Sequence, residues 1–157
     1  MGAVLRRLSA AVNKIAIYIC IAMFVMVILN CGLQVFTRYV INAALPWTEE
    51  LARFSFVWMS LLGGSVCVKH KSHAVVTVII NYLPDNVRSK FILVADALVL
   101  FGAVLMIVQG WKMVAVTGRQ LSPAMYLPMS YVYLSVPISG LAIFVHKISD
   151  ISEWIVS

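Results

Sequence analysis

Four long apolar runs limit what this chain can fold into more than any other feature of the sequence. They lie at about residues 15–36, 47–68, 91–111 and 129–146. A helix needs about 20 predominantly apolar residues to cross a bilayer, and each run comes near that length. The runs therefore predict an all-α membrane protein with four transmembrane helices. We expect residues 1–157 to form a single four-helix membrane domain, and no internal repeat indicates a transporter built from inverted repeats within the chain.

The composition also indicates a membrane environment. Hydrophobic residues make up 62% of the chain and charged residues 11%, whereas a soluble domain carries about 25% charged residues. The net charge of +6 does not indicate nucleic-acid binding, because the basic residues flank the apolar runs and form no stripe or arm. Basic residues in that position set the topology of a membrane protein. We therefore expect membrane lipids, and no nucleic acid, among the partners.

The N-terminus resembles a secretory signal, because basic residues precede an apolar stretch. However, that stretch continues to Phe36, well beyond the roughly 7–15 residues of a typical signal core. We therefore interpret it as a retained first span. The three cysteines, Cys20, Cys31 and Cys67, lie inside apolar runs without a CxxC motif. This pattern is typical of small apolar side chains and not of a disulfide framework or a metal site.

The basic residues also predict the orientation. With four spans, both termini lie on one side of the membrane, and the loops can be assigned to two sides. One side holds eight basic residues, Arg6, Arg7, Lys14, Lys69, Lys71, Arg88, Lys90 and Lys147. The other side holds three, Arg38, Lys112 and Arg119. The positive-inside rule then places both termini in the cytoplasm.

Two of the connections are more than simple turns. Residues 74–83 are apolar but too few to cross a bilayer, so we expect a short segment along the cytoplasmic interface, or an extension of the second helix. On the other side, the stretch "TGRQLSPAMYLPMS" contains Pro123, Pro128 and Tyr126. Prolines interrupt helices, and aromatic residues favour the headgroup region. We expect an ordered, non-helical loop there.

The stretch "LPWTEELARF", residues 45–54, begins the second span. We expect Thr48 to cap the helix, which leaves Glu49 and Glu50 in the first turn. Carboxylates there complement the positive end of the helix dipole, each contributing about 0.3–1 kcal/mol. Trp47 fits a tryptophan anchor at the membrane boundary. A capped and anchored helix start accounts for all of these residues.

That interpretation does not account for Arg53. The residue is four positions after Glu49 and three after Glu50, so it shares a helix face with both. It also lies about 6 Å deeper in the membrane than Glu49. A charge inside a bilayer is costly without a partner. We expect Arg53 to join a structural ion-pair network and to face another helix or another subunit; a substrate site is the weaker alternative.

Asp96 lies inside the third span and allows two interpretations. It is either a proton or cation relay, or it bonds to a neighbouring helix or to water near Arg88 and Lys90. A relay normally uses a second titratable group at similar depth, and the sequence indicates none. We therefore favour the packing role. In the second span, Leu62, Gly63 and Gly64 form an "LGG" stretch whose small residues favour close helix packing.

The histidines give no indication of a cofactor. His70, His73 and His146 lie at predicted membrane boundaries, whereas haem ligands in a bundle face each other inside the spans. The sequence also contains no pattern typical of a serine or cysteine nucleophile and no glycine-rich phosphate loop. We therefore expect no cofactor, no metal and no enzyme activity.

The stretch "FTRYVINAALPWTEELARFSFVWMSLLGGSVCVKHKSHAVV" resembles the small membrane subunit of TRAP transporters (tripartite ATP-independent periplasmic transporters, DctQ-type). The family shows an arginine and an aromatic residue ending the first span. A tryptophan, an acidic pair and an arginine follow, and then an "LG" stretch, a basic patch and a histidine. The matching residues here are Arg38, Tyr39, Trp47, Glu49, Glu50, Arg53, Leu62, Gly63, Lys69 and His73. One departure is Thr77, where the family often has an acidic residue.

The resemblance implies a division of labour in a bacterial inner membrane. A large multi-span TRAP subunit holds the substrate and sodium sites. A periplasmic substrate-binding protein delivers an organic acid, such as a C4-dicarboxylate, a 2-oxo acid or a sialic acid. The small subunit is then a non-catalytic scaffold for the large one. Its candidate structural or interface residues are Arg38, Trp47, Glu49, Glu50, Arg53, Gly63 and His73.

Two alternatives remain open at this stage. The first is a self-sufficient small four-helix transporter that is proton-coupled and works as a homo-oligomer, with Asp96 as its coupling carboxylate. The second is a redox membrane anchor, which would show itself in a visible absorption spectrum.

Overall fold

The computed structural model describes residues 2–70 and 85–156. The expected interfacial segment, residues 74–83, and His73 both lie outside these ranges. The helices are α1 (Gly2–Tyr39), α2 (Pro46–Lys69), α4 (Asp85–Thr117), α5 (Ser130–Tyr133) and α6 (Ser135–Val156).

The described part of the chain is helical and contains no strand beyond an isolated bridge between Leu121 and Pro128. Four of its helical segments are long and apolar enough to cross a membrane. These segments are Val4–Tyr39, Pro46–Lys69, Phe91–Thr117 and Ser130–Ile151. The predicted fold class, an all-α protein with four membrane helices, is confirmed.

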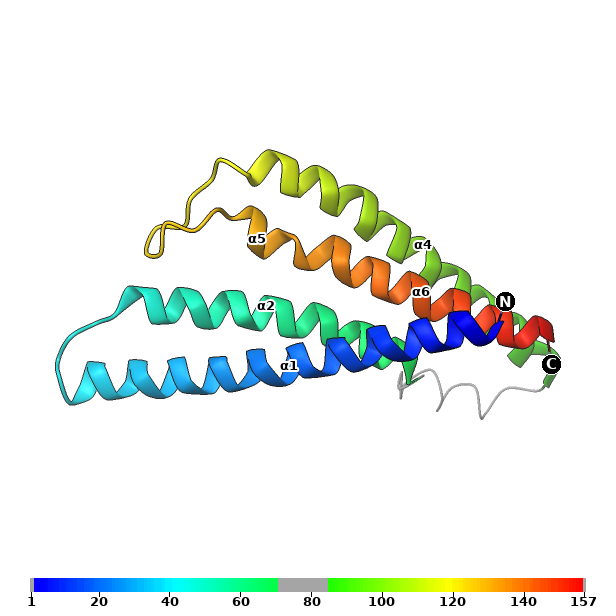
Figure 1. Cartoon of the computed structure of the whole chain (residues 1–157), viewed down its shortest axis with the longest axis horizontal. Helices are drawn as coiled ribbons and strands as arrows, with labels where there is room; N and C mark the ends of the chain where they lie inside the picture. The colour runs from blue at the N-terminus through cyan, green and yellow to red at the C-terminus, as the bar shows by residue number, and fades with distance from the viewer. Residues whose placement is uncertain (1, 71–84, 157) are drawn as a thin grey trace.

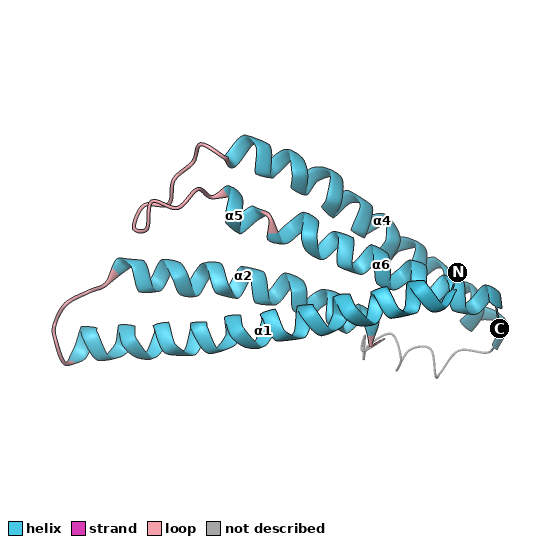
Figure 2. Cartoon of the chain, in the orientation of Figure 1, coloured by secondary structure: helices cyan, strands magenta, loops and turns pink. Residues whose placement is uncertain are grey.

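Two helices differ from the apolar runs that predicted them. The first run starts at about residue 15, but α1 already starts at Gly2 and passes through Arg6 and Arg7. Apolarity marks the part of a helix that suits the bilayer, whereas arginine itself is a good helix former. The fourth run corresponds to two helices, since α5 and α6 are separated at Leu134 (Figure 2). Pro137 is the third residue of α6, and a helix tolerates proline in its first turn because the N–H groups there have no intrahelical acceptor.

The helices form two antiparallel pairs that diverge towards one end of the molecule. Figure 1 shows α1 beside α2, and α4 beside α5 and α6. Both chain termini lie at the end where the pairs converge, here called the terminal end. The connection between α1 and α2 and the segment 118–129 lie at the opposite end, here called the loop end.

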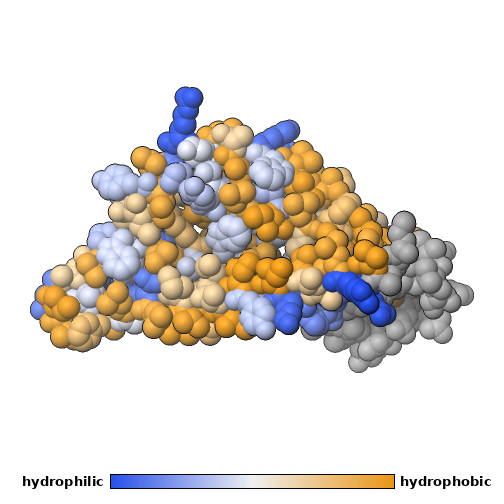
Figure 3. Space-filling model, viewed as in Figure 1, coloured by the Kyte–Doolittle hydropathy of each residue, from blue (hydrophilic) through white to orange (hydrophobic). Residues whose placement is uncertain are grey.

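α6 lies at the centre of the chain and α4 at its edge. α6 packs against α1, α2 and α4, whereas α4 packs against α5 and α6. Burial follows this order: 50% of the most apolar stretch of the fourth span is buried within the chain, against 6% for the third span. Apolar residues therefore dominate the surface, as the face in Figure 3 shows. This outer surface fits lipid or a partner protein as its neighbour.

Close packing within the chain depends on two glycines that the sequence analysis did not single out. A Cβ at Gly110 would lie 2.7 Å from Pro137 Cδ, and a Cβ at Gly140 would lie 2.9 Å from Met106 Cβ. α4 and α6 can approach this closely because both positions lack a side chain.

Within the described part of the chain, no helix packs closely against the glycines of the "LGG" stretch. A Cβ at Gly63 or Gly64 would meet nothing within 4 Å. Only Leu62 faces inward, at 3% exposed. The sequence pattern identifies small residues in a span, but it does not say which of them meet a neighbouring helix.

Candidate functional site

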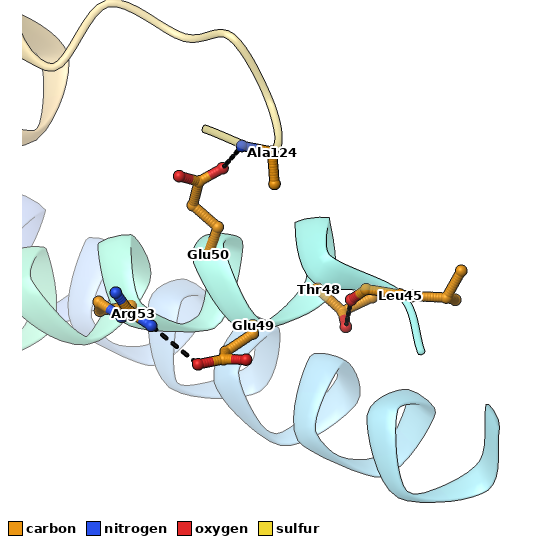
Figure 4. Close-up of polar contacts among 6 residues, drawn as sticks. All are labelled: Leu45, Thr48, Glu49, Glu50, Arg53 and Ala124. Carbon is orange, nitrogen blue, oxygen red and sulfur yellow. Dashed lines mark hydrogen bonds and ion pairs between the residues drawn. The ribbon is translucent and has the colours of Figure 1, made fainter. Parts of the chain in front are cut away.

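α2 begins earlier than the expected cap at Thr48. The helix starts at Pro46, after Leu45 with an extended backbone and no side-chain cap. The fixed φ of proline suits the first helical position, so Thr48 becomes the third residue of the helix. Its hydroxyl instead donates a hydrogen bond of 2.7 Å to the carbonyl oxygen of Leu45 (Figure 4), and its side chain is fully buried. The predicted cap is therefore wrong.

Arg53 pairs with one of the two neighbouring carboxylates. Its Nη2 donates to Glu49 Oε1 at 2.8 Å, and the two side chains are 66% and 60% exposed. They lie one helical turn apart on the outside of α2, as Figure 4 shows. The pair contacts no third charged group in the described ranges. This ion pair therefore does not hold α2 to another helix of the same chain.

Glu50 has a different environment, although it is the next residue. Its side chain turns towards the loop between α4 and α5 (Figure 4) and is 7% exposed. Oε2 accepts the backbone N–H groups of Ala124 at 3.1 Å and of Met125 at 2.8 Å. The carboxylate also lies near the N-terminus of α2, where the helix dipole favours negative charge. Glu50 therefore holds a loop 74 residues further along the chain.

The loop that Glu50 holds, residues 118–129, forms a hairpin and is called here the hairpin loop. Ser122 N donates to Leu127 O at 2.9 Å, and Met129 N donates to Gln120 O at 2.8 Å. Tyr126 at its tip has a φ of 54° and a side chain that is 72% exposed. Non-glycine residues rarely adopt this backbone conformation. The ordered, non-helical loop predicted from the two prolines is confirmed.

Arg38, grouped with Glu49, Glu50 and Arg53 by resemblance, is not brought to that pair. It lies exposed in the last turn of α1 and forms no ion pair within the described part of the chain. Trp47 is 41% exposed, and its indole forms no hydrogen bond within the described ranges. The sequence analysis missed Trp58, whose Nε1 donates to the carbonyl oxygen of Tyr131 at 3.2 Å and so links α2 to α5.

Exposed residues recur on α2 every three or four positions, which places them along one side of the helix. We call this surface the α2 outer stripe. Its members are Glu49, Arg53, Phe56, Ser60, Gly64 and Cys67. The stripe carries charges near the loop end and small residues in the half of α2 that is nearer the terminal end. Gly63, the small residue expected at an interface, lies at its margin with open space around it.

At the other end of the molecule, Asp96 is paired. Lys147 Nζ of α6 donates to Asp96 Oδ1 at 2.5 Å; the side chains are 9% and 38% exposed. The predicted bond to a neighbouring helix is confirmed. The expectation of no second titratable group at that depth is wrong, because Lys147 was assigned to the membrane boundary from the sequence.

The histidines at the terminal end join helices within the chain. His146 is fully buried, and its Nδ1 lies 2.9 Å from Ser9 Oγ of α1. His70, at the end of α2, lies with Nε2 3.3 Å from Asn13 Nδ2. His146, predicted at a membrane boundary, is thus enclosed by other helices of the chain, because a residue near the end of an apolar run can be buried where several helices converge.

Comparison with known proteins gives a consistent result. Residues 26–156 match the family model described as "Tripartite ATP-independent periplasmic transporters, DctQ component". A TRAP transporter small permease protein of Haemophilus influenzae is 27% identical over 139 residues, which cover 88% of this chain and 86% of that protein. The sialic acid TRAP transporter small permease protein SiaQ of Vibrio cholerae is 30% identical over 108 residues, 69% of this chain and 62% of that protein. The isethionate TRAP transporter permease protein DctMQ of Oleidesulfovibrio alaskensis is 33% identical over 112 residues, 70% of this chain and 18% of that protein.

Proposed function

We propose a role that starts from family membership: the chain belongs to the DctQ component family of the tripartite ATP-independent periplasmic transporters. It is a multi-pass membrane component of a transporter and not an enzyme. Beyond this, we propose that it is the non-catalytic small permease subunit of a sodium-coupled transporter in a bacterial inner membrane. In this role it stabilises a large multi-span subunit. Both termini of the small subunit are then cytoplasmic, and its loop end is periplasmic.

The proposed cargo is an organic acid, such as a C4-dicarboxylate, a 2-oxo acid or a sialic acid. Relatives are named for sialic acid and for isethionate, both organic anions. We propose that a periplasmic binding protein delivers the acid and contacts the hairpin loop transiently. The bonds from Glu50 to Ala124 and Met125 support this, because they hold the loop in place with Tyr126 72% exposed.

The observation that carries the scaffold proposal is the α2 outer stripe. Glu49 and Arg53 are charged and exposed within a helix long enough to cross a membrane. Charged residues in spans normally face protein or a water-filled cavity and not lipid. Small residues such as Gly64 let a second helix approach closely. A partner subunit on this stripe satisfies both conditions.

One relative supports a large membrane partner. The match to the DctMQ permease protein covers 70% of this chain but 18% of that protein. A stretch similar to this chain is thus part of a much longer permease polypeptide. We propose that the same two parts associate as separate chains here.

The test uses two glycines that both have open space around them. Gly64 lies on the stripe and Gly102 lies on α4, away from it. The tagged full chain is co-expressed with the large permease subunit and purified in mild detergent. We expect Gly64→Leu to reduce the recovered complex by about tenfold or more, because overpacking a close interface costs about 1–3 kcal/mol. Gly102→Leu is the matched control and leaves recovery unchanged.

Two results contradict the proposal. The first is equal recovery of the large subunit with both leucine variants. The second is proton-coupled transport by the purified chain alone in liposomes, which assigns it to the self-sufficient class. Arg53→Ala distinguishes a scaffolding role of Arg53 from a direct role in transport. For a scaffolding role, we expect substrate uptake and complex assembly to fall together. Normal assembly with lost uptake gives Arg53 a part in transport itself.

A further inference from the structure

An apolar groove lies between α1, α2 and α6, with a volume of about 250 Å³. Its floor consists of buried residues, Leu62 at 3% exposed, Ala16 at 3% and Ala142 at 6%. Its rims carry large exposed side chains, with Ile15 at 60% and Leu141 at 43%. A buried floor between exposed apolar rims defines a groove that opens to whatever surrounds the helices.

The groove extends for about 10 Å along α1 and α6. It follows residues 12–19 of α1 and 138–145 of α6, and seven helical residues span about 10 Å. α1 and α6 run in opposite directions (Figure 1), so Val12 and Val145 both mark the end nearer the termini. A whole helix is about 10–12 Å across. A single hydrocarbon chain fits a groove of this size, whereas a second helix does not.

Beyond that end of the groove, two fully buried polar side chains lie between α1 and α6. Ser9 and His146, which bond to each other at 2.9 Å, follow Val12 and Val145 along their helices. Lys69 lies seven residues after Leu62, so it occupies the same face of α2, about 10 Å further towards the terminal end. It is partly buried and forms no ion pair with any residue in the described ranges.

α1 adds further basic residues at the terminal end. Arg6, Arg7 and Lys14 are exposed on α1, a helix without any aspartate or glutamate. Basic residues next to a span attract anionic lipids. From the membrane centre outward, the molecule thus offers an apolar groove and then a lysine without an ion pair in the described ranges, in the order of an acyl chain and its phosphate.

We propose that the groove binds one acyl chain of an anionic glycerophospholipid, with the lipid phosphate at Lys69. The lipid then fills the space between α1 and α6 over Leu62 and neutralises Lys69, which forms no ion pair with the residues that the structure describes. The site is independent of the proposed subunit contact. At 100° per residue, Arg53 and Gly64 lie about 160–180° around α2 from Leu62.

The experiment measures lipid binding to the purified full chain by native mass spectrometry. Phosphatidylglycerol and phosphatidylcholine with the same acyl chains are the two probes. We expect one tightly retained phosphatidylglycerol and a preference for it over phosphatidylcholine. Lys69→Gln is expected to weaken phosphatidylglycerol binding by about fivefold and to remove the preference. The matched control is Lys112→Gln, an exposed lysine on α4 that does not line the groove, which leaves both unchanged.

A second variant tests the chain-binding part. Ala142→Phe fills the groove floor and is expected to remove binding of both lipids, with helix content checked by circular dichroism. Equal losses in the two lysine variants overturn the proposal by showing only non-specific charge attraction. No preference in the wild type also overturns it, because the anionic headgroup is then not recognised. Release of the lipid when the large subunit binds also overturns it, because the groove then belongs to that partner.

Discussion

Removal of the Glu50 carboxylate tests the contact that joins α2 to the hairpin loop. Glu50→Ala takes away the acceptor of two backbone N–H groups, those of Ala124 at 3.1 Å and Met125 at 2.8 Å. A hydrogen bond to a charged group contributes about 1.5–3 kcal/mol, so the two bonds together contribute about 3–6 kcal/mol before any cost. Burying the carboxylate at 7% exposure offsets part of that gain. We expect a net loss of about 2–3 kcal/mol in the free energy of unfolding.

Glu49→Ala is the matched control, because it removes the same group one residue earlier. Glu49 is 60% exposed and pairs with Arg53 four residues away. Exposed pairs of this kind contribute about 0.3–0.5 kcal/mol. For a chain of this length, 1 kcal/mol shifts the unfolding temperature by about 2–4 °C. We therefore expect a drop of about 4–12 °C for Glu50→Ala and about 1–2 °C for Glu49→Ala.

The assay is thermal unfolding of the purified chain in mild detergent, followed by circular dichroism. Limited proteolysis of residues 118–129 adds a local readout, since the hairpin loop loses its attachment in the Glu50 variant. Glu50→Gln keeps one oxygen acceptor without the charge, so its loss of stability is expected to be intermediate. Equal unfolding temperatures for the two alanine variants, with equal cutting rates, would refute the reasoning.

Two further predictions concern α4 and α6. Gly110→Ala and Gly140→Ala are expected to lower the free energy of unfolding by about 1–3 kcal/mol through overpacking. Gly102→Ala is the control, because open space surrounds that position, and it is expected to be neutral or stabilising. A loss of stability for Gly102→Ala as large as for the other two variants contradicts the packing argument. Lys147→Met leaves Asp96 without its partner and is expected to cost about 1–3 kcal/mol, less than a fully buried pair because Asp96 is 38% exposed. The double variant with Asp96→Asn is expected to recover most of that loss in the same unfolding assay, and a double variant as unstable as the single one contradicts it.

The membrane fold was predictable because the bilayer acts on local sequence. A span needs only enough consecutive apolar residues, and each of the four runs satisfies that condition without knowledge of its neighbours. The non-helical hairpin loop was predictable for a similar reason, since Pro123 and Pro128 constrain the backbone where they stand. The start of α2 was predicted less well, because Pro46 begins the helix before Thr48. Pro46 and Thr48 indicate different starting points for the helix, and the observed start follows the backbone preference of proline.

A local pattern predicts only one of the charged contacts within the described ranges. Glu49 and Arg53 are one helical turn apart, so their pairing follows from spacing alone. Glu50 binds a loop 74 residues away, and Asp96 pairs with a lysine 51 residues away. The sequence by itself determined which segments suit the membrane, because that depends on the apolarity of each segment. Only the tertiary structure decided which polar groups and glycines meet, because these contacts depend on how the helices are rotated and placed against one another.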